Sequence, residues 1–228
     1  MTLVGYWPLN EESGDKAYDH SGNENHGTIN DGGDSTVPEA SGILGQNAYS
    51  FDGSNDYVEI SLNRDLWKAN TLSISLWIKP VNLNAEQDYF SRVKNWGSES
   101  QFKLGQSGNG DLQFAAKDEN GDTRITEQSS KQLKTDRWNH VTANFDGAKG
   151  EIYVNSSKIP LSQDNTYNGL KNISSTNMRI GSRVNDSFYS KGKISEVRIY
   201  NRPLTESEIQ YLYNVGKRGL QTTSKKTS

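Results

Sequence analysis

Short stretches in which every second side chain is apolar recur along this 228-residue chain. The clearest covers residues 71–79, where Leu72, Ile74, Leu76 and Ile78 alternate with mostly polar neighbours. A period of two places these four side chains on one face of a β-strand, because successive side chains of a strand point to opposite faces. Comparable stretches predict further strands at residues 3–9, 48–51, 56–60, 88–93, 101–105, 111–116, 122–127, 138–145, 151–154, 177–182 and 192–200.

Turn-forming pairs separate these stretches, among them Asp52-Gly53, Asn109-Gly110, Asn120-Gly121 and Asp146-Gly147. Glycine at such positions accepts the positive φ that tight turns require. Because no helical stretches alternate with the strands, we expect antiparallel pairing and no βαβ units. The sequence therefore predicts an all-β fold, a two-sheet antiparallel β-sandwich that forms one domain over residues 1–219.

One short helix is predicted near the C-terminus. Thr205 is a candidate N-cap, and Glu208 three residues later completes a capping box. An apolar stripe follows, and Gly216 is expected to end the helix. Threonine, serine and lysine predominate in residues 220–228, which predicts a disordered tail there.

Composition and charge exclude several classes of function. A formal net charge of −3 gives no electrostatic footprint for nucleic acid. No stretch approaches the roughly 20 apolar residues of a membrane-spanning helix, so we expect no membrane insertion. The chain has no cysteine, which rules out disulfides, thiolate catalysis and cysteine-ligated metals. The first residues lack a basic segment followed by an apolar one, so we expect no signal peptide in this chain.

Four segments, taken in order, resemble the laminin-G-like domains of bacterial, archaeal and viral surface proteins. They share motifs such as Gly5-Tyr6-Trp7-Pro8 and Phe51-Asp52-Gly53, and they lie at residues 5–28, 49–58, 138–155 and 192–204. The resemblance extends from about residue 3 to residue 216. It implies a jelly roll of the concanavalin A-like lectin type, with two stacked sheets. Because such folds host many functions, it implies much less about the ligand.

The same resemblance implies a structural calcium ion. A carboxylate from the N-terminal loop, Asp19, and one from the last strand, Glu196, would close the site, with Asn23 and His26 contributing main-chain oxygens. Calcium takes six to eight such oxygen ligands. Ser195 stands where many relatives carry an acidic residue, which predicts a weaker site. The alternative is that Asp19 and Asn23 only cap turns. A zinc ion at the loop histidines is disfavoured, because oxygen donors predominate there.

We expect this chain not to be an enzyme. Retaining glycosidases need two carboxylates about 5 Å apart, and the chain has no Glu-x-Asp-x-Glu run of the kind that jelly-roll glucanases use. Ser195 to Arg198 is similar to part of an alginate lyase strand, but Ile194 replaces its leading arginine and no Gln-Ile-His or Gln-Val-His follows. His140 could be a general base, but a hydrogen-bonded packing role is favoured by its place within a strand.

Aromatic residues in two polar loops are the candidate ligand contacts. Trp96 lies in one loop, and Phe188 and Tyr189 lie in another. Aromatic rings stack on the apolar faces of sugars, while polar groups orient the hydroxyls. The sequence therefore favours a non-catalytic carbohydrate-binding or adhesion module that binds a polysaccharide or glycoconjugate and belongs to an extracellular, cell-surface or virion protein.

Two alternatives stay open at this point. The chain could be a structural or protein-interaction domain of a virion, filament or multidomain surface protein, with a surface protein as its partner. The loop aromatics Trp96 and Tyr189 could also fold back over the ends of the sheets. By contrast, Trp7, Trp77 and Trp138 belong to predicted strands and are expected in the core.

Overall fold

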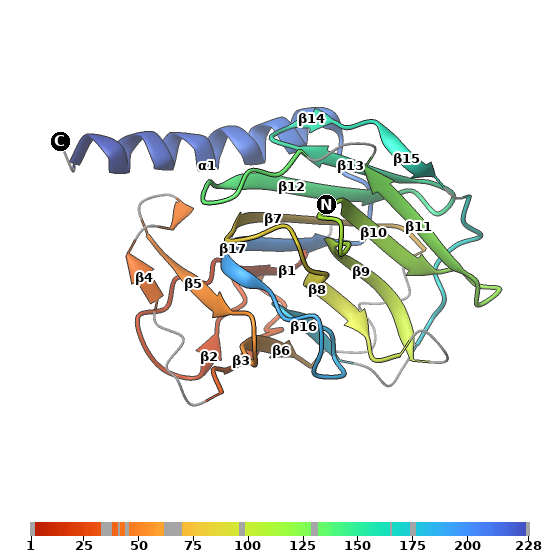
Figure 1. Ribbon diagram of the computed structural model, residues 1–228, viewed down its shortest axis with the longest axis horizontal. Helices are drawn as coiled ribbons and strands as arrows, with labels where there is room; N and C mark the ends of the chain where they lie inside the picture. The colour runs from red at the N-terminus through yellow and green to blue at the C-terminus, as the bar shows by residue number, and fades with distance from the viewer. Residues whose placement is uncertain are drawn as a thin grey trace.

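A computed structural model describes residues 3–32, 38–40, 42–43, 46–61, 70–95, 99–128, 132–164, 166–173 and 177–226. In this part of the chain, two antiparallel sheets stack face to face, and one long helix lies outside them (Figure 1). The predicted two-sheet antiparallel sandwich is confirmed. No helix among these residues combines the length and the apolar character needed to cross a membrane.

The first sheet has eight strands, in the order β14-β13-β12-β7-β17-β5-β4, with β1 also paired to β17. Its strands are β1 (Leu3–Trp7), β4 (Pro38–Ala40), β5 (Asn47–Asp52), β7 (Leu72–Pro80), β12 (Asn139–Phe145), β13 (Gly150–Val154), β14 (Ser157–Lys158) and β17 (Lys191–Tyr200). The last strand, β17, is central, because it pairs with β1, β5 and β7.

The second sheet has nine strands, in the order β15-β11-β10-β9-β8-β16-β6-β3-β2. They are β2 (Lys16–Ala17), β3 (Gly27–Asn30), β6 (Tyr57–Ile60), β8 (Gln87–Val93), β9 (Ser100–Gln106), β10 (Leu112–Lys117), β11 (Thr123–Gln128), β15 (Leu161–Asp164) and β16 (Met178–Ile180). Each predicted strand is present. The five strands that the periodicity misses, β2, β3, β4, β14 and β15, have four residues or fewer, too few to establish a period.

The core fills the space between the sheets. The four apolar side chains of β7 lie in it as predicted, each at most 1% exposed. From the facing sheet, Phe90 and Phe102 stack with their ring centroids 6.0 Å apart. Full burial of such a side chain stabilises the fold by about 1.5–3 kcal/mol. Trp7 is fully buried here, whereas Trp138, also expected in the core, is only half-buried.

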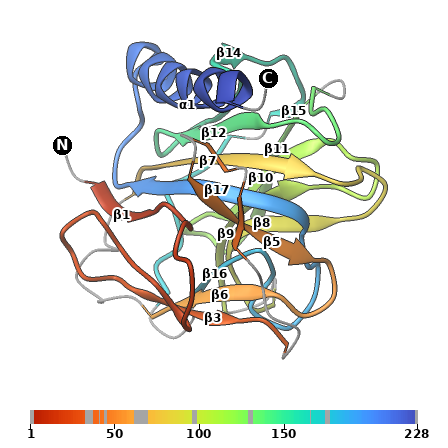
Figure 2. The ribbon, with the colours of Figure 1, turned by 90° about the vertical axis from the view of Figure 1, so that its left-hand side faces the viewer.

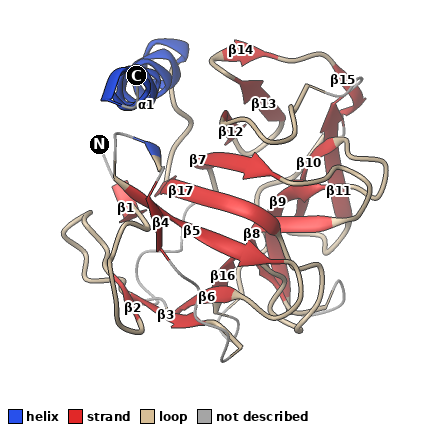
Figure 3. Cartoon of the chain, turned by 60° about the vertical axis from the view of Figure 1, so that its left-hand side comes forward, coloured by secondary structure: helices blue, strands red, loops and turns tan. Residues whose placement is uncertain are grey.

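Part of the opposite face of the first sheet is buried as well, because helix α1 (Glu206–Lys226) lies over β12 and β7 (Figures 2 and 3). Trp77 belongs to this outer face, and its ring stacks on Tyr213 of the helix with centroids 5.8 Å apart. A Cβ atom on Gly216 would lie 2.5 Å from the Trp77 ring. At Gly216 the helix therefore packs directly against the sheet, with no room for a larger side chain.

The prediction that Gly216 ends the helix is wrong. The helix continues to Lys226, so it includes residues 220–226, where the sequence predicts a disordered tail. A helix propagates readily once it is nucleated and packed, and Gly219 is still buried one turn from Gly216. The start of the helix is as predicted, since Thr205 Oγ1 accepts from Glu208 N at 3.3 Å and Glu208 Oε2 accepts from Thr205 N at 2.9 Å.

Candidate functional site

An open pocket of about 470 Å³ lies on the second sheet, next to the loop of residues 181–190. Of the three predicted ligand contacts, only Tyr189 lines it. Phe188 lies in the same loop but is not part of the lining, and Trp96 lies outside the described residues. The lining is formed by Ile29, Asn30, Asp31, Gly32, Asn55, Tyr57, Asp186 and Tyr189.

Strand pairing brings these distant residues together. Asn30 at the end of β3 pairs with Tyr57 at the start of β6. On its other side β6 pairs with β16, in which Ile180 lies opposite Val58. The loop after β16 therefore reaches the start of β6 and places Asp186 and Tyr189 across from Tyr57.

Arg179 lies behind the pocket and contacts two of its lining residues, Tyr57 and Asp186. Its guanidinium carbon lies 3.7 Å from the centroid of the Tyr57 ring. Its Nη1 donates to Asp186 Oδ1 at 2.7 Å, and its Nη2 lies 3.5 Å from Glu59 Oε1. Burial, and then the negative charge of Asp186, raise the pKa of Tyr189. One buried cation thus orients the aromatic ring on one wall and the carboxylate on the other.

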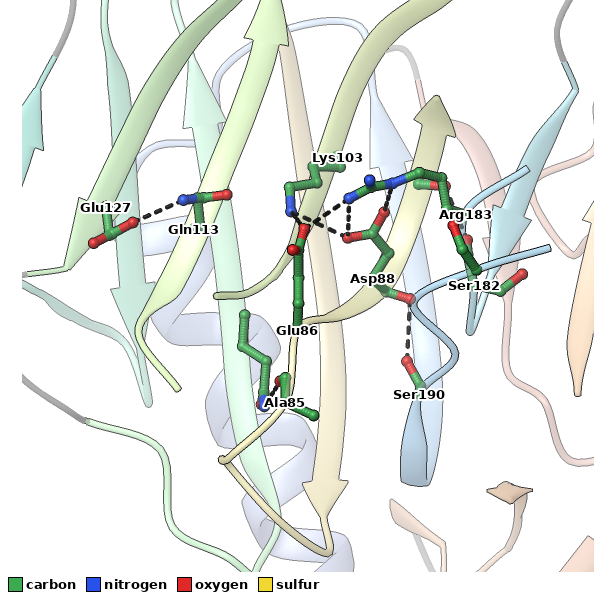
Figure 4. A network of polar contacts seen from close by, with 12 residues as sticks. Ala85, Glu86, Asp88, Lys103, Gln113, Glu127, Ser182, Arg183 and Ser190 are labelled. Atoms are coloured by element: carbon green, nitrogen blue, oxygen red, sulfur yellow. Dashed lines mark hydrogen bonds and ion pairs between the residues drawn. The ribbon is translucent and has the colours of Figure 1, made fainter. Parts of the chain in front are cut away.

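A buried network of charges anchors the loop to β8 and β9 (Figure 4). Arg183 Nε donates to Asp88 Oδ2 at 2.8 Å, and Arg183 Nη2 donates to Glu86 Oε1 at 2.8 Å. Lys103 Nζ lies 2.8 Å from Glu86 Oε1 and 3.3 Å from Asp88 Oδ1. Two cations therefore balance two carboxylates, as burial of charge requires. Burial alone would raise the pKa of Glu86, but the hydrogen bonds and charges of Lys103 and Arg183 hold it below its usual value.

The same network shapes the backbone of the loop. The Arg183 guanidinium carbon lies 3.8 Å from the centroid of the Phe188 ring, and Asp88 N donates to Phe188 O at 2.9 Å. Asp186 and Phe188 both have positive φ, 58° and 54°, which non-glycine residues adopt only when the surroundings impose it. Phe188 thus anchors the loop that carries Asp186 and Tyr189.

The predicted calcium residues have other partners in the structure. Both carboxylate oxygens of Asp19 accept hydrogen bonds. Oδ1 accepts from Tyr6 N and Ser21 N, both at 2.8 Å, and Oδ2 accepts from Ser21 Oγ at 2.7 Å and Asn25 N at 3.0 Å. All four lone-pair positions of the carboxylate are therefore used, three by the loop and one by Tyr6 of β1, and the bonds within the loop form the turn-capping arrangement.

Glu196, Asn23 and His26 are also engaged. Glu196 Oε2 accepts from Arg198 Nη2 at 2.6 Å and from Tyr6 Oη at 3.0 Å. Asn23 Nδ2 donates to Leu3 O at 2.8 Å, and His26 Nδ1 accepts from Asp19 N at 3.0 Å.

Among the described residues, no group of three or more histidine, aspartate or glutamate side chains could hold a metal ion. In this arrangement an arginine already neutralises Glu196, and N–H and O–H groups surround Asp19, so both carboxylates would have to give up these contacts to bind a calcium ion. Calcium binding stays a prediction of the resemblance.

His140 has the packing role that its position in a strand predicts. It is 1% exposed on the outer face of β12, and its Nε2 lies 2.9 Å from Ser75 Oγ. Its ring lies 5.2 Å from Trp77 and 6.1 Å from Tyr213 between centroids. Burial, and then the positive charge of Arg198, lower its pKa to about 3. His140 is therefore neutral at physiological pH and shielded from solvent.

Sequence reasoning missed every lining residue other than Tyr189, namely Ile29, Asn30, Asp31, Gly32, Asn55, Tyr57 and Asp186. One signal could have found Tyr57. Val58 and Ile60 follow the period of a half-buried strand, so Tyr57 between Asp56 and Val58 falls on the opposite, outward face. An aromatic side chain on an outward face is a candidate binding residue.

Known structures share this fold. Domain 4 of AbnA, an extracellular arabinanase from Geobacillus stearothermophilus determined in complex with arabinotriose, superimposes with a TM-score of 0.72 at 21% identity, covering 93% of this chain and 98% of that one. The binding domain of botulinum neurotoxin serotype D gives a TM-score of 0.67 at 18% identity, and that of Paraclostridial Mosquitocidal Protein 1 gives 0.62 at 20% identity. This chain spans about half of each toxin domain, 51% and 52%.

In sequence, the chain is 28% identical to Paraclostridial mosquitocidal protein 1 of Paraclostridium bifermentans over an alignment of 160 positions that covers 62% of this chain and 12% of that protein. The model of one protein family matches residues 52–210, more than half of the chain. Three of the laminin-G-like segments, 49–58, 138–155 and 192–204, overlap that match, and the two-sheet jelly roll agrees with it. The chain belongs to the concanavalin A-like lectin/glucanases superfamily.

Proposed function

We propose that this chain is a non-catalytic carbohydrate-binding module of an extracellular or surface protein, and that its ligand is a polysaccharide or glycoconjugate. The observation that carries the proposal is the convergence of Tyr57 and Tyr189 on one pocket with Asp186, Asn30 and Asn55. Tyrosine rings supply the apolar surface on which sugar rings stack, and carboxylate and amide groups orient hydroxyls. A volume of about 470 Å³ is in the range of small-molecule sites.

Contacts from behind hold the lining side chains in place, an arrangement that favours recognition of a flexible sugar. Arg179 contacts both Tyr57 and Asp186. The Arg183 network fixes the loop that carries Asp186 and Tyr189. A site fixed before the ligand arrives loses little conformational entropy on binding. The structurally similar arabinanase domain is seen with arabinotriose, and the similar toxin domains are named as binding or receptor-binding domains. These neighbours support a glycan as the partner.

A glycan array followed by calorimetry tests the proposal. For a glycan that binds, we expect Tyr189→Ala to weaken the affinity by more than about tenfold, as the loss of an aromatic anchor does. Tyr211→Ala is the matched control, because Tyr211 is an exposed tyrosine on helix α1, on the outer face of the other sheet. Equal loss in both variants, or in neither, would contradict a site at the pocket.

The second candidate function is a structural or protein-interaction domain of a multidomain surface protein. The observation that favours it is the likeness to receptor-binding domains of toxins, of which this chain matches about half. A stable complex with a surface protein, together with no binding across the glycan array, would support this candidate over the first.

A further inference from the structure

The charged residues that line the pocket are all negative. Two of its eight lining residues, Asp31 and Asp186, are carboxylates, and the others are two asparagines, two tyrosines, an isoleucine and a glycine. None of the lining residues is a lysine, arginine or histidine. The side chain of Asp186 is 67% exposed, so its charge faces solvent and any ligand that enters.

Arg179, which lies directly behind the lining, offsets only part of this charge, because one guanidinium stands against the carboxylates of Asp186 and Glu59, and it is not open to a ligand. It is only 6% exposed, and its guanidinium is covered by the Tyr57 ring. It already has Asp186 and Glu59 as ionic partners, and it donates to Arg183 O at 3.3 Å. An incoming carboxylate would have to break these contacts to reach it, which would leave an aspartate without its partner.

We propose that the pocket selects neutral sugars against sugars that carry carboxylate or sulfate groups, an inference that rests on the proposed carbohydrate-binding function. Sugar hydroxyls donate to carboxylate oxygens in charge-assisted hydrogen bonds, which are stronger than neutral ones. A ligand carboxylate has no proton to donate at neutral pH, and it would face the like charges of Asp31 and Asp186. Such a contact weakens an otherwise matched ligand by roughly tenfold or more at low salt.

The test uses pairs of oligosaccharides in which a carboxylate is either free or esterified. Calorimetry would compare trigalacturonate with its fully methyl-esterified form, and sialyllactose with its methyl ester, next to a panel of neutral trisaccharides that includes arabinotriose. We expect the neutral member of each pair to bind more tightly wherever a pair binds. The difference should shrink at high salt, because the screening length falls from about 10 Å at 0.1 M to about 3 Å at 1 M.

Variants then assign the selection to the pocket. Asp186→Asn and Asp31→Asn should each reduce the difference in affinity between the acidic and the neutral oligosaccharide of a pair. Glu206→Gln, which removes the same charge at the start of helix α1, should leave the difference unchanged. Melting curves of each variant identify any that fail to fold.

Two results would overturn the inference in distinguishable ways. Equal or tighter binding of the acidic partners would contradict the selection for neutral sugars and leave the carbohydrate-binding function standing. Absence of binding by every neutral and acidic glycan would contradict the proposed function itself, and the selection with it.

Discussion

The guanidinium of Arg183 and the carboxylate of Asp88 form a buried ion pair that fastens the pocket loop to the second sheet. Their closest contact is 2.8 Å, the Asp88 side chain is fully buried, and Arg183 is 6% exposed. Their separation of 95 residues means that the pair joins the loop to a strand, β8, that is remote in the sequence. The pocket therefore depends on a charge network that contributes no residue to its lining.

The first prediction concerns this pair. Arg183→Met should destabilise the fold by roughly 3–5 kcal/mol, because it leaves Asp88 buried without a main partner. Chemical denaturation measures the change. The double variant Arg183→Met/Asp88→Leu should recover part of the loss, since it removes both charges together. A double variant whose loss equals the sum of the two single losses would show that the two residues do not interact.

Gly216 gives the second prediction. At an ordinary helix position, glycine to alanine stabilises by about 1 kcal/mol. Gly216→Ala should instead lower the melting temperature, because the new methyl group would lie within 2.5 Å of the Trp77 ring. Gly108→Ala is the control, since a Cβ there meets no atom within 4 Å. A stabilised Gly216→Ala protein would contradict the packing of α1 on the first sheet.

The third prediction is a pH dependence caused by His140. Its pKa is about 3 in the folded chain, and the usual value is 6.5. Between these values the unfolded chain binds a proton that the folded chain does not, so stability falls as the pH drops from 6.5 toward 3. His140→Phe should flatten this part of the curve of unfolding free energy against pH. If the unfolding free energy falls equally in both proteins between pH 6.5 and pH 3, His140 is not the source of the pH dependence.

The fourth prediction separates hydrogen bonding from calcium at the N-terminal loop. Asp19 accepts four hydrogen bonds from its surroundings, so Asp19→Ala should destabilise the fold by about 2 kcal/mol or more. Because no ion is needed for these contacts, the loss should be equal in EDTA and in calcium, and the unaltered protein should melt at the same temperature in both. A melting temperature that falls on chelation would instead support the calcium site that the family resemblance implies.

The strands and the start of the helix could be predicted because their signals are local. The period-two stretch at 71–79 specifies β7 within one residue at each end, and Thr205 and Glu208 specify the first turn of α1. The end of the helix could not be predicted, because Gly216 looks like a stop signal until its contact with Trp77 is known. Its role is decided by a residue that lies 139 positions earlier in the chain.

The pocket was predictable only in part. Tyr189 could be identified from its polar loop, because an aromatic residue there is conspicuous. Tyr57 and Asn30 face Tyr189 only through the pairing of β3, β6 and β16, which no local pattern specifies. The roles of Phe188 and Glu196 could not be predicted for a similar reason. Phe188 packs against an arginine, and Glu196 forms an ion pair with another, and no local pattern specifies either contact.

The central claim is that ligand binds between Tyr57 and Tyr189. The most direct measurement is a titration of the isotope-labelled chain with a glycan identified on the array, followed by the backbone amide signals in NMR spectra. The account predicts that the largest shifts belong to Tyr57, Asp186 and Tyr189 and that they saturate with the affinity found by calorimetry. Saturating shifts confined to other surfaces, such as the exposed Tyr18 of the N-terminal loop or Tyr211 of α1, would contradict it.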